Sequence, residues 1–178
     1  MKEIKILGIS GSLRKGSFNT KLVKYLQKIM PRGVTMEVVT LEEIPLYDED
    51  LENAEPKGVA DLREKIKNAD GLILVSPEYN YSVGGIMKNT IDWMSRNGNA
   101  FENKKVGLSG ASTGGFGTVR GQMHLRQIMF ALDVQTSNLE SYLSRAQTKF
   151  NEAGDIIDET DKTNLHKFIE EFTKWVAE

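Results

Sequence analysis

A loop rich in glycine and serine, residues 8–19, carries the side chains of this chain that are best suited to bind an anion. It follows a short apolar run and precedes residues 20–30, whose apolar positions recur at helical spacing. Glycine lets the backbone turn tightly, serine offers hydroxyl donors, and a helix start presents unpaired N–H groups and the positive end of its dipole. Ser17 or Asn19 is expected to cap that helix. The loop is predicted to bind phosphate; a connection without any ligand is the alternative.

The kind of phosphate follows from what the loop lacks. Gly11 and Gly16 have the spacing of a P-loop, but Ser17 stands where a nucleotide triphosphatase needs lysine. The G-x-G-x-x-G fingerprint of a dinucleotide-binding domain is missing as well. What remains is a hydroxyl-rich pocket with one cation, Arg14. Such a pocket suits a single phosphate group, for example that of flavin mononucleotide (FMN).

Two further loops have compositions that suit a flavin ring. Residues 77–85 combine aromatic rings, amides and a glycine pair, and residues 112–117 have glycines that let the backbone approach a flat ring. A flavin needs a flat surface together with donors and acceptors for its pyrimidine end. The alternative for the second loop is structural, with Tyr79 and Tyr81 as packing residues and Asn80 as a turn residue.

Short apolar runs alternate with helical patterns along the whole chain. Strands are predicted at residues 4–7, 34–41, 71–75, 105–109 and 133–136, and helices at 20–30, 59–68, 86–96, 119–132 and 161–176. Residues 42–56 are predicted to be a surface loop pinned to the domain by residues 44–47, and residues 137–157 to be irregular. The alternation predicts a parallel sheet with right-handed crossovers and helices on both faces.

Five strands fit the flavodoxin-like fold, an α/β three-layer sandwich whose five-stranded parallel sheet has the order 2-1-3-4-5. In such sheets ligands bind beyond the carboxyl ends of the strands, where the strand order reverses. This order places the loops after strands one, three and four around that point. They are the three loops described above, so residue pattern and topology predict the same site.

Composition narrows the functional classes. The chain of 178 residues is predicted to form one domain, residues 1–178, and its 23 basic and 25 acidic residues argue against nucleic acid or a membrane as partner. It has no cysteine for disulfides, thiolate metal sites or nucleophilic catalysis, and only two histidines. No run is apolar enough for a membrane helix and no signal segment precedes the first strand, so a cytoplasmic location is expected. His124, His166 and Trp93 are expected at surface, interface or core positions and not in catalysis.

Four segments together resemble the NADPH-dependent FMN reductase family, the flavodoxin-like group that includes bacterial chromate/quinone reductases and azobenzene reductases. The matching segments are residues 11–19 (GSLRKGSFN), 77–82 (PEYNYS), 88–93 (KNTIDW) and 124–126 (HLR). They extend over most of the domain. One departure stands out, because Gly84-Gly85 occupies positions where the family commonly has proline followed by glycine. Two glycines predict a looser loop at the ring contacts.

The resemblance implies that the first loop surrounds the FMN phosphate and that the second and third loops flank the isoalloxazine and ribityl parts. The implied cofactor-binding residues are Ser10, Ser12, Leu13, Arg14, Ser17, Phe18 and Asn19, then Pro77, Glu78, Tyr79, Asn80 and Ser82, and finally Ser112, Thr113, Gly114, Gly115 and Gly117. No side chain is implied to be catalytic, and no metal is implied. Family members are usually dimers or tetramers, so a homodimer or homotetramer with the active site near a subunit boundary is expected.

The predicted function is hydride transfer from NADPH or NADH through bound FMN to a small-molecule acceptor in a ping-pong cycle. Free flavin, a quinone, an azo compound or a metal oxyanion such as chromate could be that acceptor, and no residue selects among them. The flavin carries the chemistry while the protein supplies position and polarity. Two alternatives stay open: an FMN-containing electron carrier without a substrate, and a binding protein that kept the fold and lost the flavin. The nearly neutral charge argues against the carrier, since such carriers commonly dock through a strongly acidic face.

Overall fold

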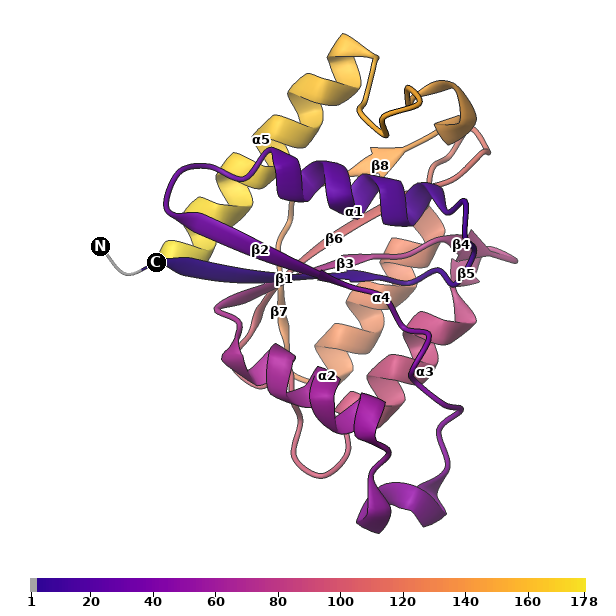
Figure 1. The fold of residues 1–178 in the computed structure, drawn as a ribbon, viewed down its shortest axis with the longest axis vertical. Helices are drawn as coiled ribbons and strands as arrows, with labels where there is room; N and C mark the ends of the chain where they lie inside the picture. Colours follow the sequence, from indigo (N-terminus) through magenta and orange to yellow (C-terminus); the bar gives the residue numbers. More distant parts are fainter. Residues whose placement is uncertain (1–2) are drawn as a thin grey trace.

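A twisted parallel sheet forms the middle layer of the molecule (Figure 1). The computed structural model describes residues 3–178. Five parallel strands follow the order β2-β1-β3-β6-β7, which confirms the predicted flavodoxin-like order. They are β1 (Ile4–Ser10), β2 (Val34–Val39), β3 (Gly71–Val75), β6 (Lys105–Ala111) and β7 (Gln135–Thr136). Every residue of β3 is buried, as expected for a central strand covered by helices on both faces.

Helices cover both faces of the sheet and produce two hydrophobic cores. Helices α1 (Phe18–Lys28) and α5 (Glu159–Ala177) pack on one face, whereas α2 (Lys57–Asn68), α3 (Gly85–Met94) and α4 (Val119–Ala131) pack on the other. All five predicted helices are therefore present, with bounds that differ by a few residues. Trp93 is buried in the second of these layers, as expected. Within residues 3–178, no helix combines the length and the apolarity that crossing a membrane requires.

The fifth strand comes in two pieces, and this corrects the prediction that residues 137–157 are irregular. After β7 the chain leaves the sheet and returns as β8 (Tyr142–Leu143), which pairs with the end of β6. A short 3-10 helix, η2 (Ala146–Thr148), follows directly. The sequence did not reveal β8 because a two-residue strand is too short to show periodicity.

Residues 42–56 form the predicted surface loop, and they contain one 3-10 helix, η1 (Glu49–Ala54). Two side chains of α3 hold this loop against the domain. The Asn89 amide accepts from the Tyr47 N–H at 2.7 Å and donates to the Pro45 carbonyl at 2.8 Å, and the Trp93 indole N–H donates to the same carbonyl at 2.9 Å. The predicted pinning by residues 44–47 is confirmed, and the KNTIDW segment has a structural explanation.

Helix α5 begins at a charged cap that makes its stability depend on pH. The pKa of the Asp158 carboxyl lies below its ordinary value because it accepts from the backbone N–H of Asp161, at 3.0 Å, and pairs with Lys149. The stabilisation is therefore present above the unfolded-state pKa of about 3.9 and is lost as the pH falls through the lower folded-state pKa.

We expect Asp158→Asn to be less stable than the wild type near neutral pH, and the difference to shrink toward about pH 3 or below. Asparagine is also a good cap, so the substitution removes the charge and keeps the capping hydrogen bond. Urea unfolding of both proteins at several pH values measures this. A stability difference that does not change with pH would contradict it.

Candidate functional site

The three predicted loops meet around one cavity of about 130 Å³ at the carboxyl edge of the sheet. The first loop joins β1 to α1, the second follows β3, and the third follows β6. The residues lining the cavity are Ser12, Arg14, Ser17, Phe18, Asn19, Pro77, Glu78, Tyr79, Ala111, Ser112 and Thr113. All except Ala111 were predicted from the sequence. Residues far apart in the chain thus form one polar pocket, as the topology predicts.

The first loop supplies donors for an anion. Ser17 is the N-cap of α1, where its hydroxyl accepts from the Thr20 N–H at 3.2 Å. Among the described residues, the backbone N–H groups of Phe18 and Asn19 donate to no protein acceptor. These are the donors that every helix start leaves unpaired, and the positive end of the helix dipole lies with them. The start of α1 therefore has the chemistry of a phosphate site.

Arg14 adds the positive charge of this end of the cavity. Its guanidinium donates to the Gly16 carbonyl at 2.9 Å and lies 5.4 Å from the centre of the Phe18 ring. The Phe18 ring stacks on the Phe150 ring with their centres 6.0 Å apart. The Lys21 ammonium lies within 6 Å of the centre of each ring. Cation–π contacts of this kind hold a cation in place without neutralising it. Arg14 is thus held at the cavity with its charge available.

Asn19 links the first loop to the third. Its side-chain nitrogen donates to the Ala111 carbonyl at 2.9 Å, and its side-chain oxygen accepts from the Ala111 N–H at 2.8 Å. Asn19 is 4% exposed and Ala111 3% exposed. The amide therefore satisfies both backbone groups of a buried residue at the end of β6, and Asn19 joins two cavity walls. No sequence signal pointed to Ala111, because the contact uses only its backbone.

The second loop is a β-hairpin, formed by β4 (Glu78–Tyr79) and β5 (Ser82–Val83). Its two turn residues, Asn80 and Tyr81, both have positive φ, 49° and 64°. Two positive φ values are typical of a type I′ turn, which suits asparagine but is strained for an aromatic residue. The turn directs the two strands so that Glu78 and Tyr79 line the cavity.

Glu78 is anchored by the first turn of α4. Its carboxylate accepts from the Arg120 guanidinium at 2.7 Å and from the Gly121 N–H at 3.0 Å. The carbon at the centre of the guanidinium lies 3.8 Å from the centre of the Tyr81 ring and 5.4 Å from that of Phe116. Arg120 thus ties the second loop to α4. The sequence analysis missed this residue, and only its position just after the third loop could have suggested it.

The remaining predicted residues lie near the cavity but do not line it: Ser10, Leu13, Asn80, Ser82, Gly114, Gly115 and Gly117. Two of their hydroxyl groups are used inside the protein. The Ser10 hydroxyl hydrogen-bonds to that of Thr20 at 2.8 Å, and the Ser82 hydroxyl to Nδ1 of His124 at 2.8 Å. Leu13 projects into solvent with 49% of its surface exposed.

Gly84, where the resemblance implies proline, is the N-cap of α3 and has φ −61° and ψ 137°. These angles are those of proline, and the preceding residue, Val83, is in a strand as proline requires. Among the described residues the Gly84 N–H donates no hydrogen bond. An added Cβ would lie 3.1 Å from Cγ of Pro77, a ring atom that moves when the ring changes its pucker.

We therefore expect Gly84→Pro to raise the free energy of unfolding by about 0.5–1 kcal/mol, because it restricts the unfolded chain. Thermal and urea unfolding measure the change. Gly84→Ala is the control, since it brings a Cβ to the same contact with Pro77 without the ring that fixes φ. A destabilised Gly84→Pro protein would show that the contact with Pro77 outweighs the gain.

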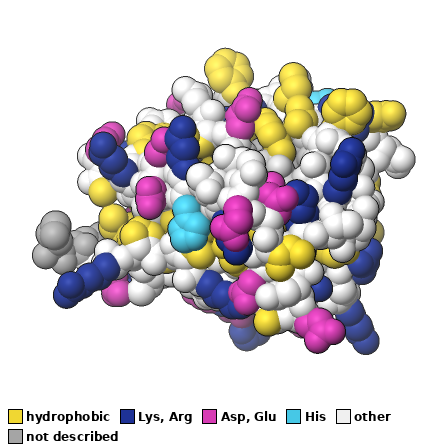
Figure 2. Space-filling model, turned by 90° about the horizontal axis from the view of Figure 1, so that it is seen from above, with side chains coloured by type: hydrophobic (Ala, Val, Ile, Leu, Met, Phe, Trp, Pro, Cys, Tyr) yellow, Lys and Arg dark blue, Asp and Glu magenta, His cyan; other side chains and the backbone are white. Residues whose placement is uncertain are grey.

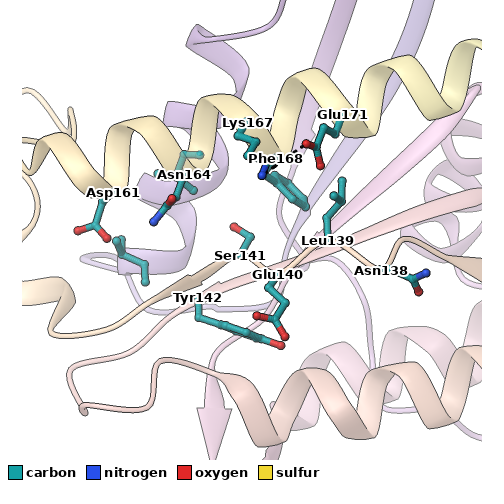
Figure 3. A pocket seen from close by; sticks show the side chains of 12 residues that line it. Asn138, Leu139, Glu140, Ser141, Tyr142, Asp161, Asn164, Lys167, Phe168 and Glu171 are labelled. Carbon is teal, nitrogen blue, oxygen red and sulfur yellow. Dashed lines mark ion pairs between the residues drawn. The ribbon is translucent and has the colours of Figure 1, made fainter.

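A larger hollow of about 420 Å³ lies elsewhere, between α5 and residues 138–143 (Figure 3). Carboxylates, one lysine and apolar side chains line it, and none of the residues predicted to bind the cofactor is among them. The Lys167 ammonium lies 3.8 Å from a carboxylate oxygen of Glu171 in an ion pair, and most of the Lys167 side chain is exposed. The smaller cavity has the converging donors and the helix start, so the chemistry favours it as the site.

Known proteins resemble this chain over most of its length. A model of the family described as NADPH-dependent FMN reductase matches residues 4–148. The chain is 41% identical to an NAD(P)H-dependent FMN reductase of Pseudomonas aeruginosa, over 98% of this chain and 96% of that one. It is 36% identical to a quinone reductase of Escherichia coli, over 98% and 96%. Among solved structures, a flavoenzyme NAD(P)H:(acceptor) oxidoreductase from Paracoccus denitrificans superimposes with a TM-score of 0.88 at 30% identity, covering 98% of this chain and 97% of that one.

Proposed function

Because the chain belongs to the NADPH-dependent FMN reductase family, we propose that it is an FMN-dependent oxidoreductase that transfers two electrons from NAD(P)H to a small-molecule acceptor. With a quinone as acceptor, NAD(P)H, a proton and the quinone give NAD(P)⁺ and the hydroquinone. Quinones and free flavin are the first acceptors to test, since the relatives are named as quinone and FMN reductases. FMN, when bound, supplies the chemistry by accepting a hydride and returning its electrons.

The observation that carries this proposal is the convergence of three loops on one cavity whose donor set fits a phosphate. We assign the phosphate to the start of α1, where the Ser12 and Ser17 hydroxyls, the unpaired N–H groups and Arg14 lie. We assign the ring system to the walls formed by residues 77–79 and 112–113. The predicted residues that do not line the cavity remain candidates for contacts with the ring edge and the acceptor.

The protein's own contribution under this proposal is position and polarity. The helix start and Arg14 bind the anionic tail, which holds the ring system at the carboxyl edge of the sheet. The Glu78 side chain is 6% exposed and is held by Arg120 and the Gly121 N–H of α4, so it acts as a fixed wall. Under this proposal protons for the reduced acceptor come from solvent, and Tyr79, which lines the cavity, is itself 58% exposed.

A visible spectrum of the purified protein, taken before and after anaerobic addition of NADPH, tests the proposal. We expect flavin absorbance that bleaches rapidly with NADPH and returns when a quinone is added. A stable one-electron species that does not respond to NADPH would support the electron carrier instead. A colourless protein that gains no absorbance with FMN would overturn the proposal.

Arg14→Ala is expected to weaken FMN binding by about 10- to 100-fold, the effect of losing a charge-assisted contact to a phosphate. The free energy of unfolding should change by less than about 0.5 kcal/mol, because the side chain is exposed. Fluorescence titration with FMN measures the affinity, and the KM for NADPH reports a second role in attracting that cofactor. Lys15→Ala is the matched control from the same loop. Unchanged FMN and NADPH affinities would reject both roles.

We also propose that the chain forms homodimers or homotetramers through α4. Hydrophobic side chains gather along one margin of the face shown in Figure 2, whereas charged side chains are spread over the rest. Met123 and Phe130, both on α4, are 61% and 86% exposed, and Phe116 just before this helix is 74% exposed. Such a set of exposed apolar side chains is typical of an interaction surface. Light scattering measures the assembly, and a monomer at micromolar concentration would contradict this proposal.

Two further predictions from the sequence stay proposals. We propose that the whole chain is one FMN-binding domain, since the three loops of the cavity come from residues across most of its length. A cytoplasmic location is proposed on the basis of the sequence alone.

A further inference from the structure

The interruption of the fifth strand is a bulge of defined size. Thr136 in β7 pairs with Val106, and Tyr142 in β8 pairs with Gly110. The edge segment therefore advances by six residues, from 136 to 142, while the neighbouring strand β6 advances by only four, from 106 to 110. Two extra residues must bow out of the sheet between them. Bulges of this kind re-aim the strand that follows and are frequent beside active sites.

Two side chains of α4 hold the carbonyl groups of this bulge. The Arg126 guanidinium donates to the Ser137 carbonyl and, at 3.2 Å, to the Leu139 carbonyl. The side-chain nitrogen of Gln122, which is 1% exposed, donates to the Ser141 carbonyl at 3.0 Å. The Ser141 carbonyl also accepts from the Gly110 N–H of β6 at 3.3 Å. The Ser137 and Leu139 carbonyls accept from no backbone N–H among the described residues, so Arg126 supplies the donors they need.

The side chains of the bulge confirm that it lies between two helices. Leu139 and Ser141 point toward α5, whereas Glu140 and Tyr142 point away from it (Figure 3). The Ser141 hydroxyl also hydrogen-bonds to that of Ser109 in β6 at 2.7 Å, in a buried position. The bulge is thus fixed from α4 on one side and from β6 on the other, and it cannot shift without breaking buried hydrogen bonds.

Beyond the bulge, the chain holds the third loop of the cavity. The Ser112 N–H donates to the Leu143 carbonyl at 3.0 Å, and the Ala146 N–H donates to the Ser112 carbonyl at 3.0 Å. The Arg145 N–H donates to the Gly114 carbonyl at 3.1 Å. Ser112 lines the cavity. A shift in the register of β8 would therefore move this wall directly.

We propose that Arg126 is a positioning residue for the cofactor cavity. By holding two carbonyls of the bulge it fixes the register of β8, and β8 in turn fixes the third loop. Arg126 does not line the cavity, so it acts only through these backbone contacts. That the wall serves FMN rests on the function proposed above. An arginine suits the task because its rigid planar fork can reach two acceptors at once.

Hydrogen exchange of the purified full chain, read from peptides that cover residues 110–116, tests the positioning itself. We compare Arg126→Gln, which loses the charge, with Arg126→Lys, which keeps it without the planar fork. Arg96→Gln is the matched control, since its guanidinium lies near Tyr47 and Glu52 and not at the bulge. We expect exchange in the third loop to accelerate about tenfold in Arg126→Gln, less in Arg126→Lys, and not in Arg96→Gln.

FMN affinity and the flavin absorption band provide the second reading. We expect FMN to bind about tenfold more weakly to Arg126→Gln, with a shifted band in the bound form, because the wall beside the ring has moved. Unchanged exchange at residues 110–116 in a folded Arg126→Gln protein would overturn the proposal. So would equal acceleration of exchange at residues 8–19, because that would indicate general destabilisation.

If Arg126→Gln does not fold, the same measurements on Arg126→Lys decide the question. If the wild-type protein binds no FMN, the proposed function is wrong. The exchange experiment would still show whether Arg126 positions the third loop.

Discussion

Replacing Asn19 by alanine is expected to lower the free energy of unfolding by about 2–4 kcal/mol. The substitution removes two hydrogen bonds, of 2.8 and 2.9 Å, and leaves the N–H and the carbonyl of Ala111 without partners. Both residues are 4% exposed or less, so the lost partners lie largely out of contact with bulk water. Urea unfolding of the protein without added FMN measures the loss.

Asn19→Asp separates the two bonds. A carboxylate can still accept from the Ala111 N–H but cannot donate to the Ala111 carbonyl, so a loss of unfolding free energy at least as large is expected where the aspartate is ionised. Asn164→Ala is the matched control, because the Asn164 side chain is exposed on α5 and makes no hydrogen bond among the described residues. If Asn19→Ala and Asn164→Ala had the same stability, the link between first and third loops would be energetically irrelevant.

The parts of the fold that repeat a pattern were predictable from the sequence. The apolar run at residues 71–75 predicted a fully buried strand, and the spacing of Leu165, Phe168 and Phe172 predicted the inward face of α5. Topology then placed three loops at one edge of the sheet, and the cavity lies there. Strand order and loop composition together were enough to find the site, since the order follows from the alternation of strands and helices and the composition is local.

The contacts that fix the walls of the cavity could not be predicted in the same way. Asn19 and Ala111 are 92 positions apart, and Glu78 and Arg120 are 42 apart. Each pair joins a side chain to a partner that only the folded sheet brings near. A surface loop and a bulge also lack periodicity, which is why β8 and the role of Arg126 escaped the sequence analysis. Local pattern specifies the elements, whereas long-range polar contacts set the geometry between them.

Replacing Arg63 by methionine is expected to have the largest effect on stability, a loss of about 3–5 kcal/mol. Arg63 is 5% exposed and lies on α2. Its guanidinium donates to the Glu55 carboxylate at 2.6 and 2.9 Å, and to the carbonyls of Trp93, Met94 and Gly98 at 2.9, 3.2 and 3.1 Å. Methionine has similar length but no donor, so a largely buried carboxylate and the carbonyls at the end of α3 would lose their partner.

The double variant Arg63→Met, Glu55→Leu makes the cause testable. If the unpaired Glu55 carboxylate causes most of the loss, removing it as well should recover part of the stability, and the two substitutions should be strongly non-additive in urea unfolding.

Lys57→Met is the control, because it breaks an ion pair with Asp61 on the surface of the same helix, where the Lys57 side chain is 87% exposed. It should lower the free energy of unfolding by less than about 0.5 kcal/mol. Because α3 also carries Asn89 and Trp93, which hold residues 44–47, Arg63→Met should accelerate hydrogen exchange in that loop. A single variant as stable as Lys57→Met would show that α3 does not depend on this buried charge.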